Sequence, residues 1–161
     1  PRPVFSMCSP GNGGDANPLN QNPRMMQAVF DEKFMAPLND YINTLTGLHE
    51  APTTPLIEVL SEITARNDYR AVTGRRTLSL ASDMLQNYGD YSQYSNRSYD
   101  YDSFAAGEYA EALSIDLQGA EIRILYLLNP KAASLQNRQH IEFYRQLFSV
   151  HGGTLASVEP L

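Results

Sequence analysis

The sequence contains a single cysteine, Cys8, among its 161 residues. One cysteine excludes a disulfide within the chain, which is typical of proteins from a reducing compartment. No apolar run approaches the roughly 20 residues that a membrane span requires. The chain also lacks an opening signal segment, in which a charged stretch precedes an apolar one. These absences predict a cytoplasmic protein without a membrane span.

Basic side chains are scarce as well. The chain has 12 Lys and Arg residues against 18 Asp and Glu residues, which gives a net charge of −6. Because phosphate binding requires clustered Lys and Arg, this balance argues against nucleic acid as a partner. We interpret the adjacent basic pair Arg75-Arg76 as a solvated turn that leads into a strand.

Length and an apolar content of 42% predict one globular domain over residues 1–161. The predicted strands cover residues 3–7, 77–81, 121–128 and 154–158. The predicted helices are one from Pro23 that Pro37 kinks or divides, one from Leu56, and two at 104–117 and 134–150. This order predicts an α/β fold with a doubly wound, mostly parallel sheet and helices on both of its faces.

Local signals mark where several of these elements begin and which faces they bury. Asn22-Pro23 and Thr54-Pro55 each match an N-cap followed by proline at the first helical position. The strand at 121–128 is apolar almost throughout, which predicts burial on both faces. The inward side of the helix from Leu56 is predicted to carry Leu56, Val59, Leu60 and Ile63.

The strand from Thr77 to Ala81 ends in Ser82-Asp83, and a long polar loop follows. In an open α/β sheet, ligands bind in the crevice at the carboxyl ends of the strands. Asp83 is therefore expected at the binding edge. The alternative role for Asp83 is to cap the turn at the end of the strand.

The loop after this strand is unusually rich in tyrosine. Tyrosine offers a large contact area with few rotatable bonds and a polar tip, and it is enriched at protein interfaces. The loop is therefore a second candidate for partner binding, and the alternative is an acidic surface loop without a binding role. Its tyrosines are Tyr88, Tyr91, Tyr94, Tyr99 and Tyr101.

Two segments of the chain resemble the von Willebrand factor A domain, especially its divergent bacterial members. Thr53-Thr54-Pro55-Leu56, with Glu58, resembles the helix start whose threonine is the second metal-site element of that family. The run Leu78-Ser-Leu-Ala-Ser-Asp83 resembles the later strand that ends in Ser-Asp or Thr-Asp, the third element. The resemblance implies a Rossmann-like sheet, with Thr54 and Asp83 as ligands of Mg²⁺ or Mn²⁺.

The first metal motif of that family, Asp-x-Ser-x-Ser, is absent from the chain. The strand at residues 3–7 resembles the family's second strand, so we expect the first strand and its helix upstream of Pro1, in a chain trimmed at that end. An upstream segment or another subunit would then complete the sheet. Two protein ligands would hold Mg²⁺ weakly, because this ion prefers about six oxygen ligands.

These observations predict a non-catalytic adaptor that binds another protein within a larger assembly. The predicted binding edge comprises Thr54, Asp83 and the two flanking loops, one with Asp15 and the other with the five tyrosines. A divalent cation would assist the binding.

An enzyme is the alternative. Gly11-Asn-Gly13-Gly-Asp-Ala16 matches the dinucleotide fingerprint G-x-G-x-x-A, so a nucleotide- or phosphate-processing Rossmann-like domain would use Gly11–Gly14 and Asp83. That mechanism needs a helix directly after the glycines, whereas the predicted helix waits until Pro23. Nucleophilic catalysis by Cys8 would need a base such as His140, and a buried structural Cys8 is the simpler interpretation.

Overall fold

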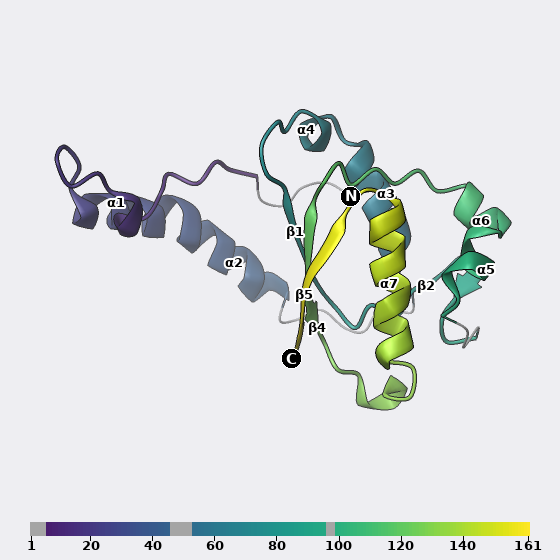
Figure 1. The fold of residues 1–161 in the computed structure, drawn as a ribbon. Coiled ribbons are helices and arrows are strands. Elements are labelled where there is room, and N and C mark those ends of the chain that lie inside the picture. The colour runs from purple at the N-terminus through teal and green to yellow at the C-terminus, as the bar shows by residue number, and fades with distance from the viewer. Residues whose placement is uncertain (1–5, 46–52, 96–98) are drawn as a thin grey trace. The chain divides into compact units, whose positions relative to one another are not determined.

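The computed structural model describes residues 6–45, 53–95 and 99–161 (Figure 1). The chain divides into two compact units, residues 1–51 and 52–161, and each is described by itself.

The first unit is built on one long helical stretch. A 3₁₀ turn η1 (Gly13–Asp15) precedes α1 (Pro23–Phe30), a π-helical segment η2 (Asp31–Met35) and α2 (Ala36–Leu45), which follow one another without a break. The Asn22 side chain accepts hydrogen bonds from the N–H groups of Arg24 and Met25, which confirms the predicted cap. Of the predicted first strand, residues 3–5 lie outside the described residues, and Ser6 and Met7 belong to no strand.

Pro37 explains the change of helix type in this unit. Proline has no N–H to continue the α-helical pattern, and its ring crowds the preceding turn. The chain meets this constraint with a wider turn, in which the N–H of Ala36 bonds to the carbonyl of Asp31. The prediction that Pro37 kinks or divides the helix is met in part, because α1 and α2 are separate α-helices but the π-helical segment η2 joins them into one continuous stretch.

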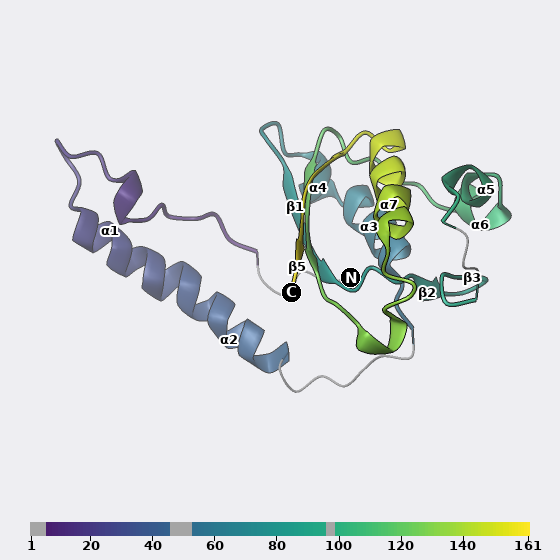
Figure 2. The same cartoon turned by 60° about the horizontal axis from the view of Figure 1, so that its bottom comes forward.

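The second unit is a mixed α/β structure around a three-stranded parallel sheet (Figure 2). The strands β1 (Thr77–Ser82), β4 (Glu121–Tyr126) and β5 (Thr154–Pro160) pair in the order β1-β4-β5. The longer helices are α3 (Leu56–Ala65) and α7 (Arg138–Val150). The shorter elements are α4 (Asn67–Arg70), the hairpin β2 (Asn87–Tyr88) and β3 (Tyr91–Ser92), α5 (Tyr101–Ala105), α6 (Glu108–Glu111) and η3 (Pro130–Ala132).

The core of this unit lies on one face of the sheet. Ile122, Ile124 and Tyr126 of β4 are buried, and they share one apolar cluster with residues of α3 and α7. In β1, every second residue from Thr77 onward is exposed, and so is Arg123 of β4. Both α3, which precedes β1, and α7, which connects β4 to β5, contribute to this cluster and lie on the same side of the sheet in Figure 2. Among the described residues, burial of β4 on both faces is not observed.

Several predicted boundaries also need correction. The helix predicted at 104–117 is two short helices, because Gly107 has an extended backbone and separates α5 from α6. The inward face of α3 is rotated from the prediction and carries Ile57, Leu60 and Thr64. Asn137 caps α7, which therefore begins four residues later than predicted.

Candidate functional site

Asp83 lies at the carboxyl end of β1, as predicted, and its carboxylate takes part in local hydrogen bonds. Oδ1 accepts from the N–H of Leu85 at 3.1 Å, and Oδ2 accepts from Nδ2 of Asn129 at 3.4 Å. The amide of Gln136 donates both to the Asp83 carbonyl and to the carbonyl of Leu127. Asn129 and Gln136, which the sequence interpretation missed, thus tie the ends of β1 and β4 together.

Met84 turns the chain inward directly after this edge. Its backbone has a φ of 60°, in the left-handed region that residues with a side chain rarely adopt, and its side chain is fully buried. The Met84 carbonyl accepts hydrogen bonds from Nε2 of His140 at 3.1 Å and from the hydroxyl of Tyr144 at 2.6 Å. Two side chains of α7 therefore hold the start of the loop in place.

His140 is neutral and structural in this arrangement. A carbonyl can only accept, so Nε2 carries the proton, and Nδ1 accepts from the hydroxyl of Tyr126 at 2.7 Å. Desolvation by burial lowers the pKa of His140 to about 4. The side chain of Gln93, also buried, accepts from the N–H of Gln86 at 3.0 Å and lies 3.2 Å from Nε2 of His140.

A second buried network joins the loop to α3. Oε1 of Gln86 accepts from the N–H of Ile57, an otherwise open donor in the first turn of α3, at 3.0 Å. Nε2 of Gln86 donates to Glu58 and to the hydroxyl of Tyr109, each at 2.8 Å. Tyr109 donates in turn to the other oxygen of Glu58, and burial raises the pKa of Tyr109 well above its ordinary value. Glu58 is thereby held as a structural acceptor.

Thr54 occupies the start of α3, but it does not cap the helix. Its backbone N–H and carbonyl pair with Asn87 at 2.8 and 3.0 Å in an isolated antiparallel bridge. The N-cap is Pro55, which makes no side-chain cap bond, so the predicted Thr54 cap is wrong. Within the described ranges, no three side chains of His, Cys, Asp or Glu gather closely enough to hold a metal ion.

The five tyrosines of the loop differ in environment. Tyr101 is buried in the core, and Tyr99 lies against the His140 ring and donates to the carbonyl of Leu135 at 2.7 Å. Tyr91 is half-buried, whereas Tyr88 and Tyr94 are 47% and 42% exposed. Tyr88 and Tyr94 are therefore the most accessible of the five for contact with another molecule.

A pocket lies between the β2–β3 hairpin and the helices α5 and α6, which are neighbours in Figure 2. We call it the hairpin pocket. Tyr91 packs edge-on against Phe104 at a centroid distance of 4.9 Å and stacks on Tyr109 at 5.2 Å. The pocket is lined by Asp90, Tyr91, Asp100, Ser103, Phe104, Gly107, Glu108 and Tyr109.

No family model, no curated protein and no solved structure matches this chain. The function therefore has to be argued from the residues and their geometry.

The Gly11–Gly14 loop belongs to the first unit, and its amides bind side chains of that unit. The N–H of Gly13 donates to Oε1 of Gln27 at 3.1 Å, and the N–H of Gly14 donates to Oδ1 of Asn12 at 2.7 Å. Asp15 closes the same turn by accepting from the N–H of Asn12 at 2.8 Å. Because α1 begins only at Pro23, its N-terminal amides do not follow the glycines directly. This geometry does not reproduce the dinucleotide-binding turn.

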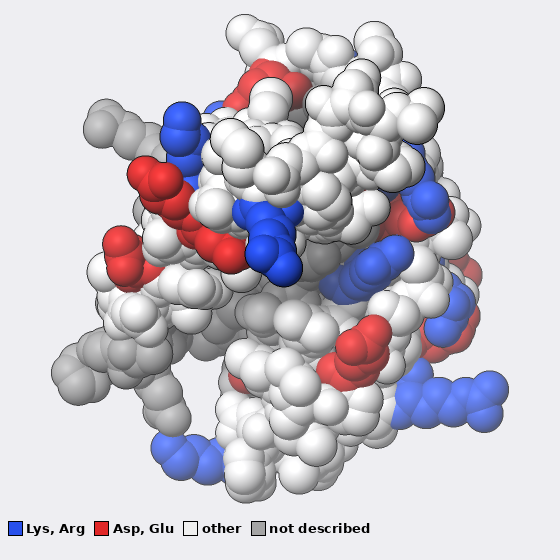
Figure 3. Space-filling view, turned by 90° about the vertical axis from the view of Figure 1, so that its left-hand side faces the viewer, with Lys and Arg blue, Asp and Glu red and all other residues white. Residues whose placement is uncertain are grey.

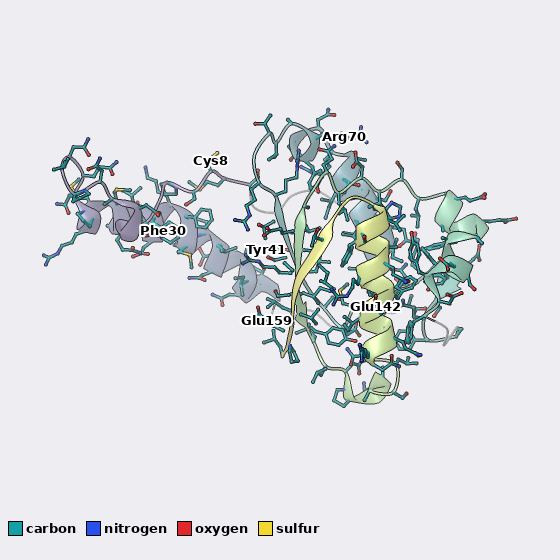
Figure 4. All side chains as sticks on the ribbon, viewed as in Figure 1. Cys8, Phe30, Tyr41, Arg70, Glu142 and Glu159 are labelled. Carbon is teal, nitrogen blue, oxygen red and sulfur yellow. The ribbon has the colours of Figure 1, made fainter. Side chains whose placement is uncertain are left out.

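Cys8 is exposed on the extended segment before η1, so the prediction of a buried cysteine is wrong (Figure 4).

Charged residues on the face in Figure 3 are interspersed, with Lys and Arg close to Asp and Glu. Among the described helices, none combines the length and the apolar character that crossing a membrane requires.

Proposed function

We propose that this chain is a non-catalytic protein-interaction domain, an adaptor within a larger assembly. It binds its protein partner at the edge formed by the end of β1, the β2–β3 hairpin and the loops around them. The observation that carries the proposal is the use of this edge's polar side chains as internal supports. Gln86, Gln93 and His140 are fully buried. The side chains of Gln93 and His140 bond to the backbone of the loop, and the side chain of Gln86 bonds to the N–H of Ile57 in α3.

Such support suits a binding surface. A loop that is already fixed loses little conformational entropy when a partner docks, so more of the contact energy contributes to affinity. Tyr88 and Tyr94 remain on the surface of the fixed loop, where aromatic side chains are typical of interface contacts. The same networks occupy His140 and Glu58, so neither side chain is available as a free base or acid in this arrangement.

The resemblance to the von Willebrand factor A domain remains part of the proposal. It is supported by the parallel sheet and by the position of Ser82-Asp83 at the end of β1. Thr54 and Asp83 as cation ligands remain a prediction. The side chains that the structure describes at this edge are poor ligands for a resident cation, because both carboxylate oxygens of Asp83 already accept hydrogen bonds from N–H groups. We therefore base partner binding on direct polar and tyrosine contacts.

The test compares the proteins retained by the immobilised wild-type chain with those retained by a double variant, Tyr88→Ala/Tyr94→Ala. Val150→Ala, at an exposed apolar position at the end of α7, is the matched control. We expect wild type and control to retain the same proteins and the double variant to lose them. Equal retention by all three chains overturns the proposal.

A second measurement addresses the metal and the enzyme alternative. Thermal unfolding is followed with Mg²⁺, Mn²⁺, EDTA or ATP, for the wild-type chain and for Asp83→Ala. A ligand that binds the native state raises the unfolding temperature. Metal stabilisation that disappears in Asp83→Ala would establish the cation site, and stabilisation by ATP would favour the enzyme over the adaptor.

A further inference from the structure

A cavity of about 130 Å³, which we call the core cavity, lies where the short helices α5 and α6 meet α3 and α7. We propose that it binds a neutral molecule of the size of phenol, with an apolar ring and one hydroxyl group. The described residues that line the core cavity do not include Tyr88 or Tyr94. The site is therefore separate from the proposed partner edge, and the two proposals are tested independently.

The walls of the core cavity belong to the hydrophobic core. Its apolar lining includes Ile57, Phe104, Leu113, Ile115 and Leu147. Protein interiors hold few voids larger than a water molecule, because the atoms that border a void lose contacts. Engineered cavities of about 150 Å³ with leucine, isoleucine and phenylalanine walls stay dry and bind benzene. The core cavity therefore has the size and the lining for one apolar ring.

Tyr101 adds a polar group to this lining. Its side chain is only 7% exposed. Within the part of the chain that the structure describes, its ring contacts Phe104 and Phe143, but its hydroxyl has no hydrogen-bond partner. The hydroxyl of a buried tyrosine usually has a partner, because an unpaired polar group in the interior costs free energy. Burial raises the pKa of Tyr101, so its hydroxyl keeps the proton and can donate a hydrogen bond to a ligand.

His151 and Glu111 set the polarity of the ligand. Nδ1 of His151 lies 3.1 Å from the carbonyl of Ile115, which can only accept, so Nδ1 carries a proton and Nε2 of the neutral ring is an acceptor. A ligand hydroxyl can accept from Tyr101 and donate to an imidazole nitrogen. The carboxylate of Glu111, an exposed residue of the lining, repels an anion. These groups favour a neutral alcohol over a hydrocarbon or a carboxylate.

The direct test titrates the full chain with phenol, with benzene, which lacks the hydroxyl group, and with benzoate, which is an anion. Binding is followed by NMR of the methyl groups of Ile57, Leu113 and Leu147, with Leu127 as a reference outside the core cavity. We expect phenol to bind roughly fivefold more tightly than benzene, and benzoate to leave the cavity signals unchanged. No shift with phenol, shifts of equal size at Leu127, or benzoate binding as tight as that of phenol would overturn the proposal.

Tyr101→Phe tests the hydroxyl. The variant removes one oxygen that has no partner among the described residues, so the fold should be retained. We expect its affinity for phenol to fall roughly fivefold, to that of benzene, while its affinity for benzene stays the same. Tyr88→Phe, which loses the hydroxyl of an exposed tyrosine, is the matched control and should bind both probes as wild type does. A preference for phenol that persists in Tyr101→Phe contradicts the proposal.

A filling variant locates the binding. Ala110 is a half-buried residue of the lining, and Ala110→Leu places a larger side chain there. We expect this variant to lose both phenol and benzene. The control Ala112→Leu, at the exposed C-cap of α6, should bind both as wild type does. Undiminished binding to Ala110→Leu would place the probes elsewhere and overturn the site. If Ala110→Leu does not fold, the comparison of Tyr101→Phe with Tyr88→Phe still decides the question.

Discussion

The hydroxyl of Tyr126 donates a hydrogen bond to Nδ1 of His140 at 2.7 Å, and both side chains are buried at the carboxyl end of β4. The other ring nitrogen, Nε2, already carries a proton and donates it to the Met84 carbonyl. A second proton could therefore bind only at Nδ1, where it would displace the hydrogen bond from Tyr126. A protonated imidazole would point a donor at the hydroxyl and carry an uncompensated charge into the core. The relationship makes the stability of the fold dependent on pH.

The first prediction is a loss of stability in weakly acidic solution. The pKa of His140 is about 4 in the folded chain, against an ordinary value of 6.5. Between these two pH values, His140 is protonated in the unfolded chain and neutral in the folded chain. The free energy of unfolding should therefore fall as the pH is lowered through this window, by at most roughly 3 kcal/mol from this residue. Urea unfolding across this pH range measures the change.

Carboxylates also titrate in this pH range, but they do so in wild type and in His140→Gln alike. The difference between the two chains therefore isolates the contribution of the histidine. The variant should be less stable near neutral pH and should show a flatter dependence on pH. His151→Gln, at a half-buried histidine at the end of α7, is the control. An unchanged slope in His140→Gln would contradict the assignment of the neutral ring.

The second prediction concerns Gln86, which has no exposed surface. Gln86→Met keeps the volume of the side chain but leaves the N–H of Ile57 and an oxygen of Glu58 without their partner. Buried groups left unpaired cost about 1–3 kcal/mol each, so we expect the free energy of unfolding to drop by roughly 2–4 kcal/mol. The exposed Gln139→Met should change it by less than about 0.5 kcal/mol. Similar losses in both variants would contradict a structural role for Gln86.

The strands and their parallel pairing were predictable because they depend on local patterns. Thr77 to Ala81 and the run after Glu121 carry strand-forming residues between turn signals, and both became strands. Burial was less predictable, because it depends on what packs against each face. Leu127 and Leu128 extend the apolar run of β4, yet they follow the strand and are 43% and 57% exposed.

The site was predictable only in outline. Asp83 was expected at the strand end because strand ends can be located from the pattern. Its partner Asn129 lies 46 positions away, and Gln136 reaches it from before α7. Contacts of such separation arise from tertiary packing and leave no periodic trace in a single sequence. His140 was considered only as a base for Cys8, because nothing near it in the sequence indicates Tyr126 or Met84 as its partners.

The third prediction concerns Gln118, whose φ of 48° lies in the left-handed region. A residue with a Cβ pays about 1–2 kcal/mol for this conformation, whereas glycine adopts it without strain. Gln118→Gly should therefore raise the free energy of unfolding by roughly 0.5–1 kcal/mol. Arg145→Gly, at an exposed position inside α7, should instead lower it by about 1 kcal/mol. Chemical denaturation of the two variants distinguishes conformational relief from a general effect of glycine, and a loss in both would contradict the strain at Gln118.

The fourth prediction concerns Gly153, just before β5. A Cβ at this position would lie 2.6 Å from Cδ1 of Leu117 and 2.7 Å from Cδ1 of Ile122, two fully buried side chains. Gly153→Ala should therefore lower the free energy of unfolding by about 1–3 kcal/mol through overpacking. Gly74→Ala is the matched control, because no atom lies within 4 Å of a Cβ built there. It should be neutral or slightly stabilising in the same denaturation experiment.

A double variant tests whether the cost at Gly153 is steric. Leu117→Val removes the atom that lies nearest to the new methyl group, while it leaves a small cavity when made alone. The double variant Gly153→Ala/Leu117→Val should therefore be more stable than the sum of the two single effects predicts, by roughly 0.5–1 kcal/mol. Strict additivity would place the cost of Gly153→Ala elsewhere, in the backbone of the turn from α7 into β5. Favourable coupling would show that the absence of a side chain at Gly153 allows this turn to pack against the core.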